Sequence, residues 1–285
     1  SWALRNVLRV SENPVERTRA YLLLGRLRSQ FRYQVVPQTD EWRTEAEEYL
    51  KQAAAIEPRN EWTDDALWQL ALFYQQEERF VETVDSLRRL LDLFGEGESE
   101  YVRQARQVLD GITRPQISIS TQPAFAPNSY LPVQVNYRNL SEARIVVRRV
   151  QPDALIQQWR DSNSARVRSV PRIAGEEVVN QPVANMVDEK DYRPHNTTVY
   201  LEPLPAGIYQ YEVQSSGAQI DSSPSIFFVT STAAAAKHHE LTSEVWVTAA
   251  ASGRPIAGAD VRLLYFYQRG VQQQRWREAR GTTGD

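Results

Sequence analysis

The sequence predicts a multidomain protein that is helical up to about residue 114 and is built of antiparallel β-strands after it. In the first part, apolar residues recur three and four positions apart, as at Leu67, Leu70, Ala71 and Tyr74, which is the period of an amphipathic helix. After Pro115 the period changes to two, in short runs separated by Pro, Gly, Asn and Ser. The chain has 285 residues, of which 41% are hydrophobic, and this length favours two or three domains.

The helical part carries recognisable start and stop signals. Asn13 followed by Pro14 predicts a capped helix start, and Thr63 is expected to cap a later helix, in front of two acidic residues. Further helices are predicted over 2–10 and 98–111, with stops at Pro58 and Gly95.

The helices are also similar to one another. One helix carries small and large apolar residues at steps of 4, 3 and 5, namely Ala46, Leu50, Ala53 and Pro58. This is the spacing of the second helix of a tetratricopeptide repeat, and the residues upstream of it match the first helix, at Tyr21, Leu24 and Gly25. A second unit follows, with Leu67, Leu70, Ala71 and Tyr74 in its first helix and Phe80, Leu87 and Leu90 in its second. The segment resembles a short tetratricopeptide array of about two repeats, in which small residues let paired helices pack closely.

Six short alternating runs predict the strands. They are rich in Val, Ile, Tyr and Phe, and no helical period separates them, which favours an antiparallel sandwich over a parallel α/β sheet. The runs are QISIS (116–120), LPVQVNYRN (131–139), ARIVVRRV (143–150), TTVYLEPL (197–204), GIYQYEV (207–213) and SIFFVT (225–230). Residues 161–192 are expected to form an insertion or long connection, and a short helix is predicted over 152–159.

These patterns divide the chain into a helical domain over 1–114, a β-sandwich over 115–232, a linker over 233–242 and the start of a second β-sandwich over 243–285. The linker holds four consecutive alanines, which are too few to form a helix alone. Residues 243–285 supply two or three strands, which cannot close a sandwich. The last domain is therefore expected to be incomplete, and the chain to be the N-terminal piece of a longer protein.

Composition excludes some classes of site. The chain contains no cysteine, so disulfides, thiolate metal sites and cysteine nucleophiles are excluded within it. A net charge of −3 disfavours nucleic acid as a partner, since such binding needs a concentrated basic face. No run of the sequence approaches the roughly 20 apolar residues of a membrane helix, and no signal-peptide pattern opens the chain.

Three sequence elements near the end carry a family resemblance. They are VWVT (245–248), a G-x-P-x-x-G-A-x-V turn and strand (253–261), and a turn of the T-x-x-G kind from Thr282 to Gly284. The preceding domain adds strands that read AFAPNSYLPVQVNYRNLSEARIVVRRV, and an L-x-x-L-x-x-G-x-Y hairpin at Leu201, Leu204, Gly207 and Tyr209. Together they resemble the macroglobulin-like β-sandwiches, immunoglobulin-like in architecture, of bacterial alpha-2-macroglobulin family proteins.

The resemblance implies a large periplasmic or cell-envelope protein that traps proteases. In this family a protease cuts an exposed bait segment, the strain among stacked β-domains is released, and the protease becomes enclosed. Some members also bond the protease through a thioester between a cysteine and a glutamine, which a chain without cysteine cannot contain. The fragment itself would be a non-enzymatic scaffold, with proteases as partners of the full-length protein.

The candidate binding surface lies in the helical part. Tyr21, Trp68, Tyr74 and Gln75 fall on first-helix positions, which in tetratricopeptide arrays line the groove that receives a peptide or protein partner. The alternative interpretation is that the aromatic residues simply fill the space between repeats.

No catalytic, cofactor-binding or metal-binding residue is predicted. His238, His239 and Glu240 form a cluster, but adjacent histidines on an extended chain point in opposite directions, and zinc sites want about four converging donors. Two other functions stay open beside protease trapping. One is a tetratricopeptide adaptor with β-sandwich modules in a cell-envelope assembly, and the other is an enzyme that uses the His238 cluster.

Overall fold

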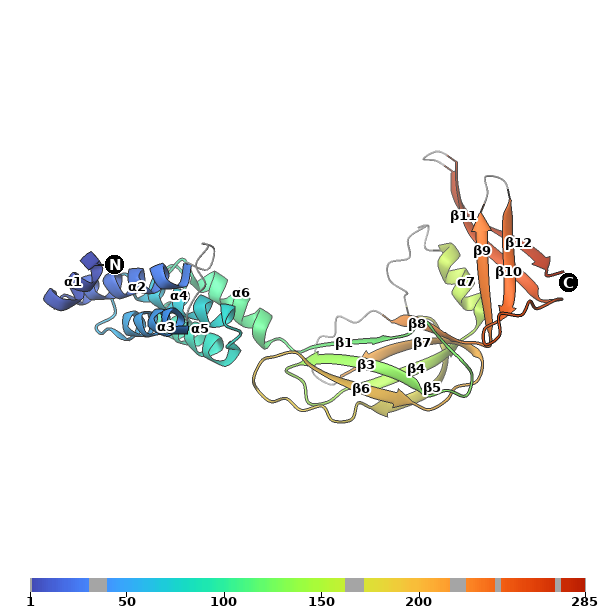
Figure 1. The fold of residues 1–285 in the computed structure, drawn as a ribbon, viewed down its shortest axis with the longest axis horizontal. Helices are drawn as coiled ribbons and strands as arrows, with labels where there is room; N and C mark the ends of the chain where they lie inside the picture. The colour runs from blue at the N-terminus through green and yellow to red at the C-terminus, as the bar shows by residue number, and fades with distance from the viewer. Residues whose placement is uncertain are drawn as a thin grey trace. The chain divides into compact units, whose positions relative to one another are not determined.

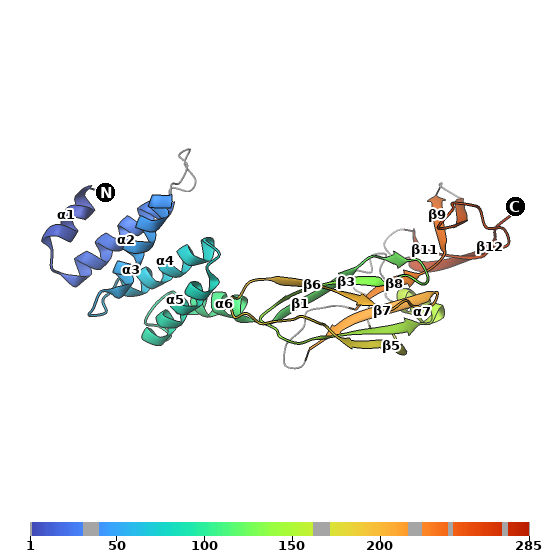
Figure 2. The same cartoon turned by 60° about the horizontal axis from the view of Figure 1, so that its bottom comes forward.

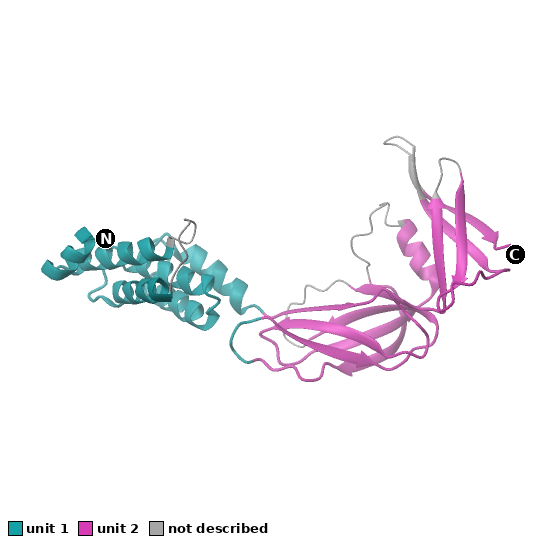
Figure 3. Cartoon of the chain, viewed as in Figure 1, with its two compact units in different colours: residues 1–114, 189–193 teal, residues 115–188, 194–285 magenta. Residues whose placement is uncertain are grey.

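The computed structural model describes residues 2–30, 40–161, 172–215, 224–238, 242–269 and 273–284 (Figure 1). It combines helices with several antiparallel β-sheets, as the change of period predicts. The chain divides into two compact units, Ser1–Arg114 with Glu189–Arg193, and Pro115–Asp188 with Pro194–Asp285 (Figure 3). Every helix within the described ranges is too short or too polar to span a bilayer.

Within its described residues, the first unit contains six helices that pack against their neighbours in sequence. Contacts join α2 to α3, α3 to α4, α4 to α5 and α5 to α6. The helices are α1 (Trp2–Val10), α2 (Pro14–Gln30), α3 (Asp40–Ala55), α4 (Thr63–Gln76), α5 (Phe80–Leu93) and α6 (Val102–Thr113). Their shared core is rich in alanine and leucine, with Leu22, Leu50, Leu67, Leu87 and Leu90 at most 1% exposed.

Two helix starts test the capping signals. At the start of α2, the backbone N–H of Val15 donates to Oδ1 of Asn13 over 2.9 Å, so the predicted cap is confirmed. The predicted cap at Thr63 is wrong. Its hydroxyl instead accepts from the backbone N–H of Asn60 over 2.9 Å, and the side chain of Asn60 accepts from the backbone N–H of Trp62. Asn60 competes successfully because a short amide side chain readily bonds the backbone two residues on.

Close packing of α2 on α3 depends on Gly25. A Cβ atom at this position would lie 2.6 Å from Cγ and 2.7 Å from Cδ2 of Leu50. Leu50 is 1% exposed and has little room to move aside. The absence of a side chain at Gly25 thus sets how near the two helices approach each other.

The second unit contains a sandwich of two β-sheets (Figures 1 and 2). One sheet has the strand order β1-β3-β6 and the other β2-β8-β7-β4-β5. The strands are β1 (Gln116–Thr121), β2 (Ala124–Phe125), β3 (Leu131–Arg138), β4 (Arg144–Val150), β5 (Gly175–Pro182), β6 (His195–Leu201), β7 (Gly207–Gln214) and β8 (Ser225–Val229). All pairings are antiparallel except that of β2 with β8, which is parallel over two residue pairs.

Inward-facing residues of both sheets form one core. On β3 the alternation is strict, and Leu131, Val133, Val135 and Tyr137 are buried. At the centre lies Phe227, which is 1% exposed. Its ring stacks on Tyr209 at 5.4 Å between centroids, and the rings of Phe125 and Tyr211 lie 5.8 and 5.9 Å away. Aromatic contacts of this kind add about 0.5–1.5 kcal/mol each to the gain from burial.

The insertion over 161–192 contains a strand that the sequence did not predict. β5 pairs with β4 along the edge of the larger sheet, and its residues are mostly exposed, so the strand lacks the alternation by which the others are recognised. The short helix predicted before it is confirmed as α7 (Pro152–Asp161).

The end of the chain forms two further strand pairs. β9 (Thr232–His238) pairs with β10 (Ser243–Ala249), and β11 (Asp260–Arg269) pairs with β12 (Gln273–Thr282). The linker prediction is therefore wrong for residues 233–238. The alanines form a strand because Val245, Trp246 and Val247 stand opposite Ala236, Ala235 and Ala234, and this pairing overrides the helix propensity of alanine.

Replacing Gly25 with alanine tests the close approach of α2 and α3. We expect Gly25→Ala to destabilise the helical unit by about 1–3 kcal/mol, because the new Cβ overlaps Leu50. The control is Gly111→Ala in α6, where a Cβ meets nothing within 4 Å. This substitution should stabilise the unit by up to about 1 kcal/mol, because alanine has the higher helix propensity. Urea unfolding followed by circular dichroism measures both, and a stabilising Gly25→Ala would contradict the interpretation.

Candidate functional site

The four residues of the predicted groove differ in how accessible they are. Trp68 and Tyr74, both on α4, are 8% and 4% exposed, whereas Tyr21 on α2 and Gln75 on α4 are half-buried. α2 and α4 are in contact, so all four residues belong to one part of the helical unit. Binding of a partner at this place stays a prediction.

The two buried aromatic residues are engaged within the unit. The ring of Trp68 stacks on Tyr101 at 5.5 Å between centroids, with 14° between the planes. The hydroxyl of Tyr101 in turn donates to Oδ1 of Asp65 over 3.0 Å. These contacts match the alternative interpretation of the sequence, in which the aromatic residues fill the space between helices.

Tyr74 belongs to a charged cluster with Glu47, Lys51, Arg79 and Glu82. Its hydroxyl donates to Oε1 of Glu47 over 3.3 Å, and the Arg79 guanidinium lies 4.6 Å from the centre of its ring. Burial, followed by the charge of Glu47, raises the pKa of Tyr74. Burial also opposes ionisation of Glu47, but hydrogen bonds from Lys51 and Arg79 outweigh it and lower the pKa of that carboxyl. The cluster ties α3 to α4 and α5 and keeps Tyr74 neutral at physiological pH.

A second charged cluster lies on the larger sheet of the sandwich, around Glu212 of β7. Its carboxylate accepts from Nη1 of Arg148 over 2.6 Å, from Nε of Arg172 over 2.9 Å and from Nε2 of Gln214 over 2.8 Å. Burial alone would raise the pKa of Glu212, but hydrogen bonds from Arg172, Arg148 and Gln214 lower it to about 2. A carboxylate so stabilised is a poor proton acceptor at neutral pH, and the cluster is therefore built for stability rather than for acid–base catalysis.

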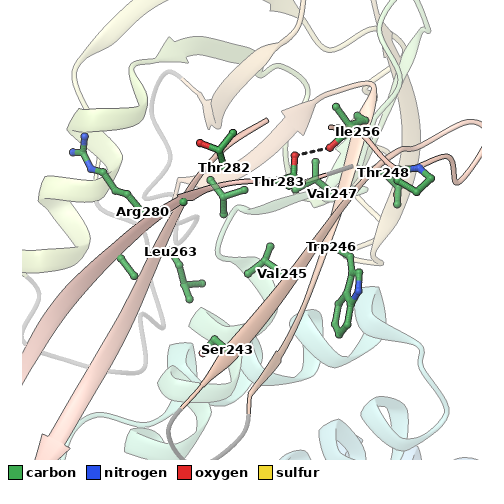
Figure 4. Close-up of a pocket in the computed structure, with 15 residues that line it drawn as sticks. Ser243, Val245, Trp246, Val247, Thr248, Ile256, Leu263, Arg280, Thr282 and Thr283 are labelled. Carbon is green, nitrogen blue, oxygen red and sulfur yellow. Dashed lines mark hydrogen bonds between the residues drawn. The ribbon is translucent and has the colours of Figure 1, made fainter. Parts of the chain in front are cut away.

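A groove of about 610 Å³ lies between the two strand pairs at the end of the chain. Its apolar lining comes from Val245 and Val247 of β10, Ile256 of the following turn, and Val261 and Leu263 of β11. Figure 4 shows Val245 and Leu263 directed into the space between the strands. An apolar groove flanked by strands is suited to an extended segment that adds alongside them.

The turn beside this groove gathers residues from three places in the sequence. The backbone N–H of Ile256 donates to the carbonyl of Val247 over 2.9 Å, and the hydroxyl of Thr283 donates to the carbonyl of Ile256 over 2.6 Å (Figure 4). The same hydroxyl accepts from the backbone N–H of Ala259 over 2.9 Å. Gly253 and Gly258 adopt positive φ values of 68° and 71°, which glycine adopts without strain.

Histidines occur at two places that could be considered for metal binding. His238 ends β9, whereas His239 and Glu240 lie outside the described residues. His195 is the first residue of β6. Structural zinc sites use four donors.

Acid unfolding tests the role of Glu212. Because the pKa of its carboxyl is about 2 in the folded protein and near 4.3 in an unfolded chain, the ion cluster contributes stability that is present above pH 4.3 and is lost as the pH falls toward 2. The difference corresponds to about 3 kcal/mol. We expect Glu212→Gln to remove most of this acid-dependent loss, measured by urea unfolding at pH 7 and pH 2.5.

The matched control is Glu202→Gln, which makes the same change of charge at an exposed position. An acid profile of Glu212→Gln that coincides with that of the parent chain would contradict the assignment.

No family model and no curated protein sequence matches the chain. Among solved structures, native alpha-2-macroglobulin from Escherichia coli spanning domains MG0-NIE-MG1 matches with a TM-score of 0.41 and 13% identity, over 60% of this chain and 58% of that chain. A structure spanning domains NIE-MG1 of the same protein matches with a TM-score of 0.37 and 16% identity, over 61% of this chain and 88% of that chain. Escherichia coli alpha-2-macroglobulin activated by porcine elastase matches with a TM-score of 0.28 and 12% identity, over 60% of this chain and 18% of that chain. The chain thus spans 58% of the length of the first of these structures.

Proposed function

We propose that this chain is a non-enzymatic scaffold segment of a bacterial alpha-2-macroglobulin-like protease inhibitor, which traps proteases by a change of conformation. The proposal includes a periplasmic or cell-envelope location and proteases as partners of the whole protein. It rests on the sequence motifs of the family and on what those motifs do in this fold.

The observation that carries the proposal is the meeting of three motif elements in one hydrogen-bonded corner. VWVT belongs to β10, and the G-x-P-x-x-G-A-x-V element forms the following turn and the start of β11. The third element, Thr282 to Gly284, begins at the last residue of β12. Val247, Ile256 and Thr283, one from each element, are joined by hydrogen bonds of 2.9 and 2.6 Å. If the three elements build one local structure, their joint recurrence in the family is explained.

The L-x-x-L-x-x-G-x-Y element gives independent support from the sandwich. Leu201 and Leu204 are 0% and 8% exposed. The hydroxyl of Tyr209 donates to the carbonyl of Pro205 over 2.7 Å, and its ring stacks on Phe227 in the core. A Cβ at Gly207 would come within 3.3 Å of the Arg149 side chain and of the Tyr209 ring. Each marked position thus has a packing role, as a scaffold domain requires.

We also propose that the helical unit is tetratricopeptide-like. Support comes from the packing of α2 on α3 and of α4 on α5, from the close approach at Gly25, and from buried small residues at Ala46, Ala53 and Ala71. The half-buried Tyr21 and Gln75 are the members of the predicted groove that a peptide or protein partner would contact, with Trp68 and Tyr74 supporting them from within.

Protease-induced compaction tests the proposed function. We expect the whole gene product, when cut by one of a panel of endopeptidases, to show a smaller radius of gyration in X-ray scattering. The protease should keep its activity on a small peptide substrate and lose most of its activity on a large protein substrate, because enclosure blocks access without touching the active site.

The control is the same protease with its nucleophile blocked, which should leave the scattering unchanged. Complete cleavage with an unaltered scattering profile, or equal loss of activity on small and large substrates, would contradict protease trapping.

A further inference from the structure

Helix α7 is firmly held on the sandwich by its apolar face. Leu155 is 2% exposed and forms a small core with Val150, at the end of β4, and with Ile173. Trp159 of the helix, Ile208 of β7 and Ile226 of β8 pack against this core. The helix is therefore fixed to the larger sheet, and any group on its other face is held at a defined place.

That other face carries two charged residues, Asp153 and Arg160. They stand seven positions apart, which is about two turns of helix, and so they project from one side. The hairpin β11–β12 presents complementary charges. Arg262 on β11 and Glu278 on β12 lie diagonally across the pair, since Arg262 stands opposite Arg280 and Glu278 opposite Leu264. Successive odd or even positions of a strand share a face, so Arg262, Glu278 and Arg280 project together.

The two sets of charges meet in an alternating chain. Oδ1 of Asp153 accepts from Nη1 of Arg262 over 2.6 Å, and the same guanidinium donates to both oxygens of Glu278, over 2.9 and 3.1 Å. Glu278 also accepts from Arg160. The order is thus acid, base, acid, base, from Asp153 through Arg262 and Glu278 to Arg160. Hydrogen bonds from Arg262 and Arg280 lower the pKa of Glu278 to about 2, so its charge persists at neutral pH.

The covalent connection between the same two parts is short. β8 ends at Val229 and β9 begins at Thr232, and the residues between them, Thr230 and Ser231, make backbone hydrogen bonds to Phe125 and Ala250. A short connection allows rotation about few bonds, so one additional attachment at a distance from it suffices to select a single orientation.

We propose that α7 and the β11–β12 hairpin form an electrostatic clamp, in which Asp153, Arg262, Glu278 and Arg160 fix the direction of the terminal strand pairs relative to the first sandwich. The clamp is a conformational device that opens when its ion pairs break. Its side chains are partly exposed, with exposed fractions from 16% for Glu278 to 85% for Asp153. Opening the clamp leaves the hydrophobic cores on both sides intact. This inference concerns the chain alone and does not depend on protease trapping.

Distance measurements between two labels test the clamp. Because the chain has no cysteine, Tyr200→Cys on β6 and Lys237→Cys on β9, both at exposed positions, give a unique label pair. Single-molecule energy transfer should show one narrow distance distribution in 50 mM salt. It should broaden in 1 M salt, where the screening length falls to about 3 Å.

Variants locate the effect. Arg160→Ala and Arg262→Ala should each lose the narrow distribution in low salt. Arg280→Ala is the matched control, because Arg280 pairs with Glu278 within the hairpin over 2.6 Å and is not needed to reach α7. The exchange Asp153→Arg with Arg262→Asp should recover part of the narrow distribution that Arg262→Asp alone loses. Circular dichroism checks that each variant stays folded.

Two results would overturn the proposal. One is a distribution in the unsubstituted labelled chain that does not change with salt, which needs no variant to fold. The other is equal broadening by Arg160→Ala and Arg280→Ala, which would show that the hairpin's own charge balance, and not its attachment to α7, sets the distribution.

Discussion

The packing of aromatic side chains around Phe227 is the constraint on which the second unit depends. Phe227 lies on β8, and the rings that surround it come from β2 and β7. The same strand β8 leads within two residues into β9, and its outward-facing Ile226 helps to seat α7. The position of one strand thus determines the core of the sandwich, the base of the helix and the point from which the terminal strand pairs depart.

Much of this architecture could be predicted from the sequence because apolar residues recur, within short stretches, with the period of a helix or of a strand. β3 alternates so regularly that the pattern alone assigns its inward residues, and Asn13 with Pro14 marks the start of α2 correctly. β5 and β9 could not be recognised in this way. β5 is an edge strand with few buried residues, and the alanines of β9 have no preference of their own for a strand. Both are strands because a partner strand offers its backbone, and no local pattern identifies that partner.

The candidate sites show the same division. Periodicity placed Tyr21, Trp68, Tyr74 and Gln75 on helices, but it could not show what each side chain contacts. The ring of Trp68 stacks on that of Tyr101, which directly precedes α6. The clamp residues were missed altogether. Asp153 and Arg160 share a helix face that the sequence could have indicated, yet their partners are more than a hundred positions away, and local periodicity does not connect surfaces so far apart.

The parallel pairing of β2 with β8 has a mechanical consequence. Two backbone hydrogen bonds, from Phe228 to Pro123 and from Thr230 to Phe125, accompany this pairing. In parallel neighbours, tension that arrives at the start of one strand and at the end of the other acts along the strands and loads their hydrogen bonds together. The bonds must then break in concert, as in shear, and not one after another as in a zipper. Tension applied between β2 and β8 would therefore act on the same strand, β8, that organises the core.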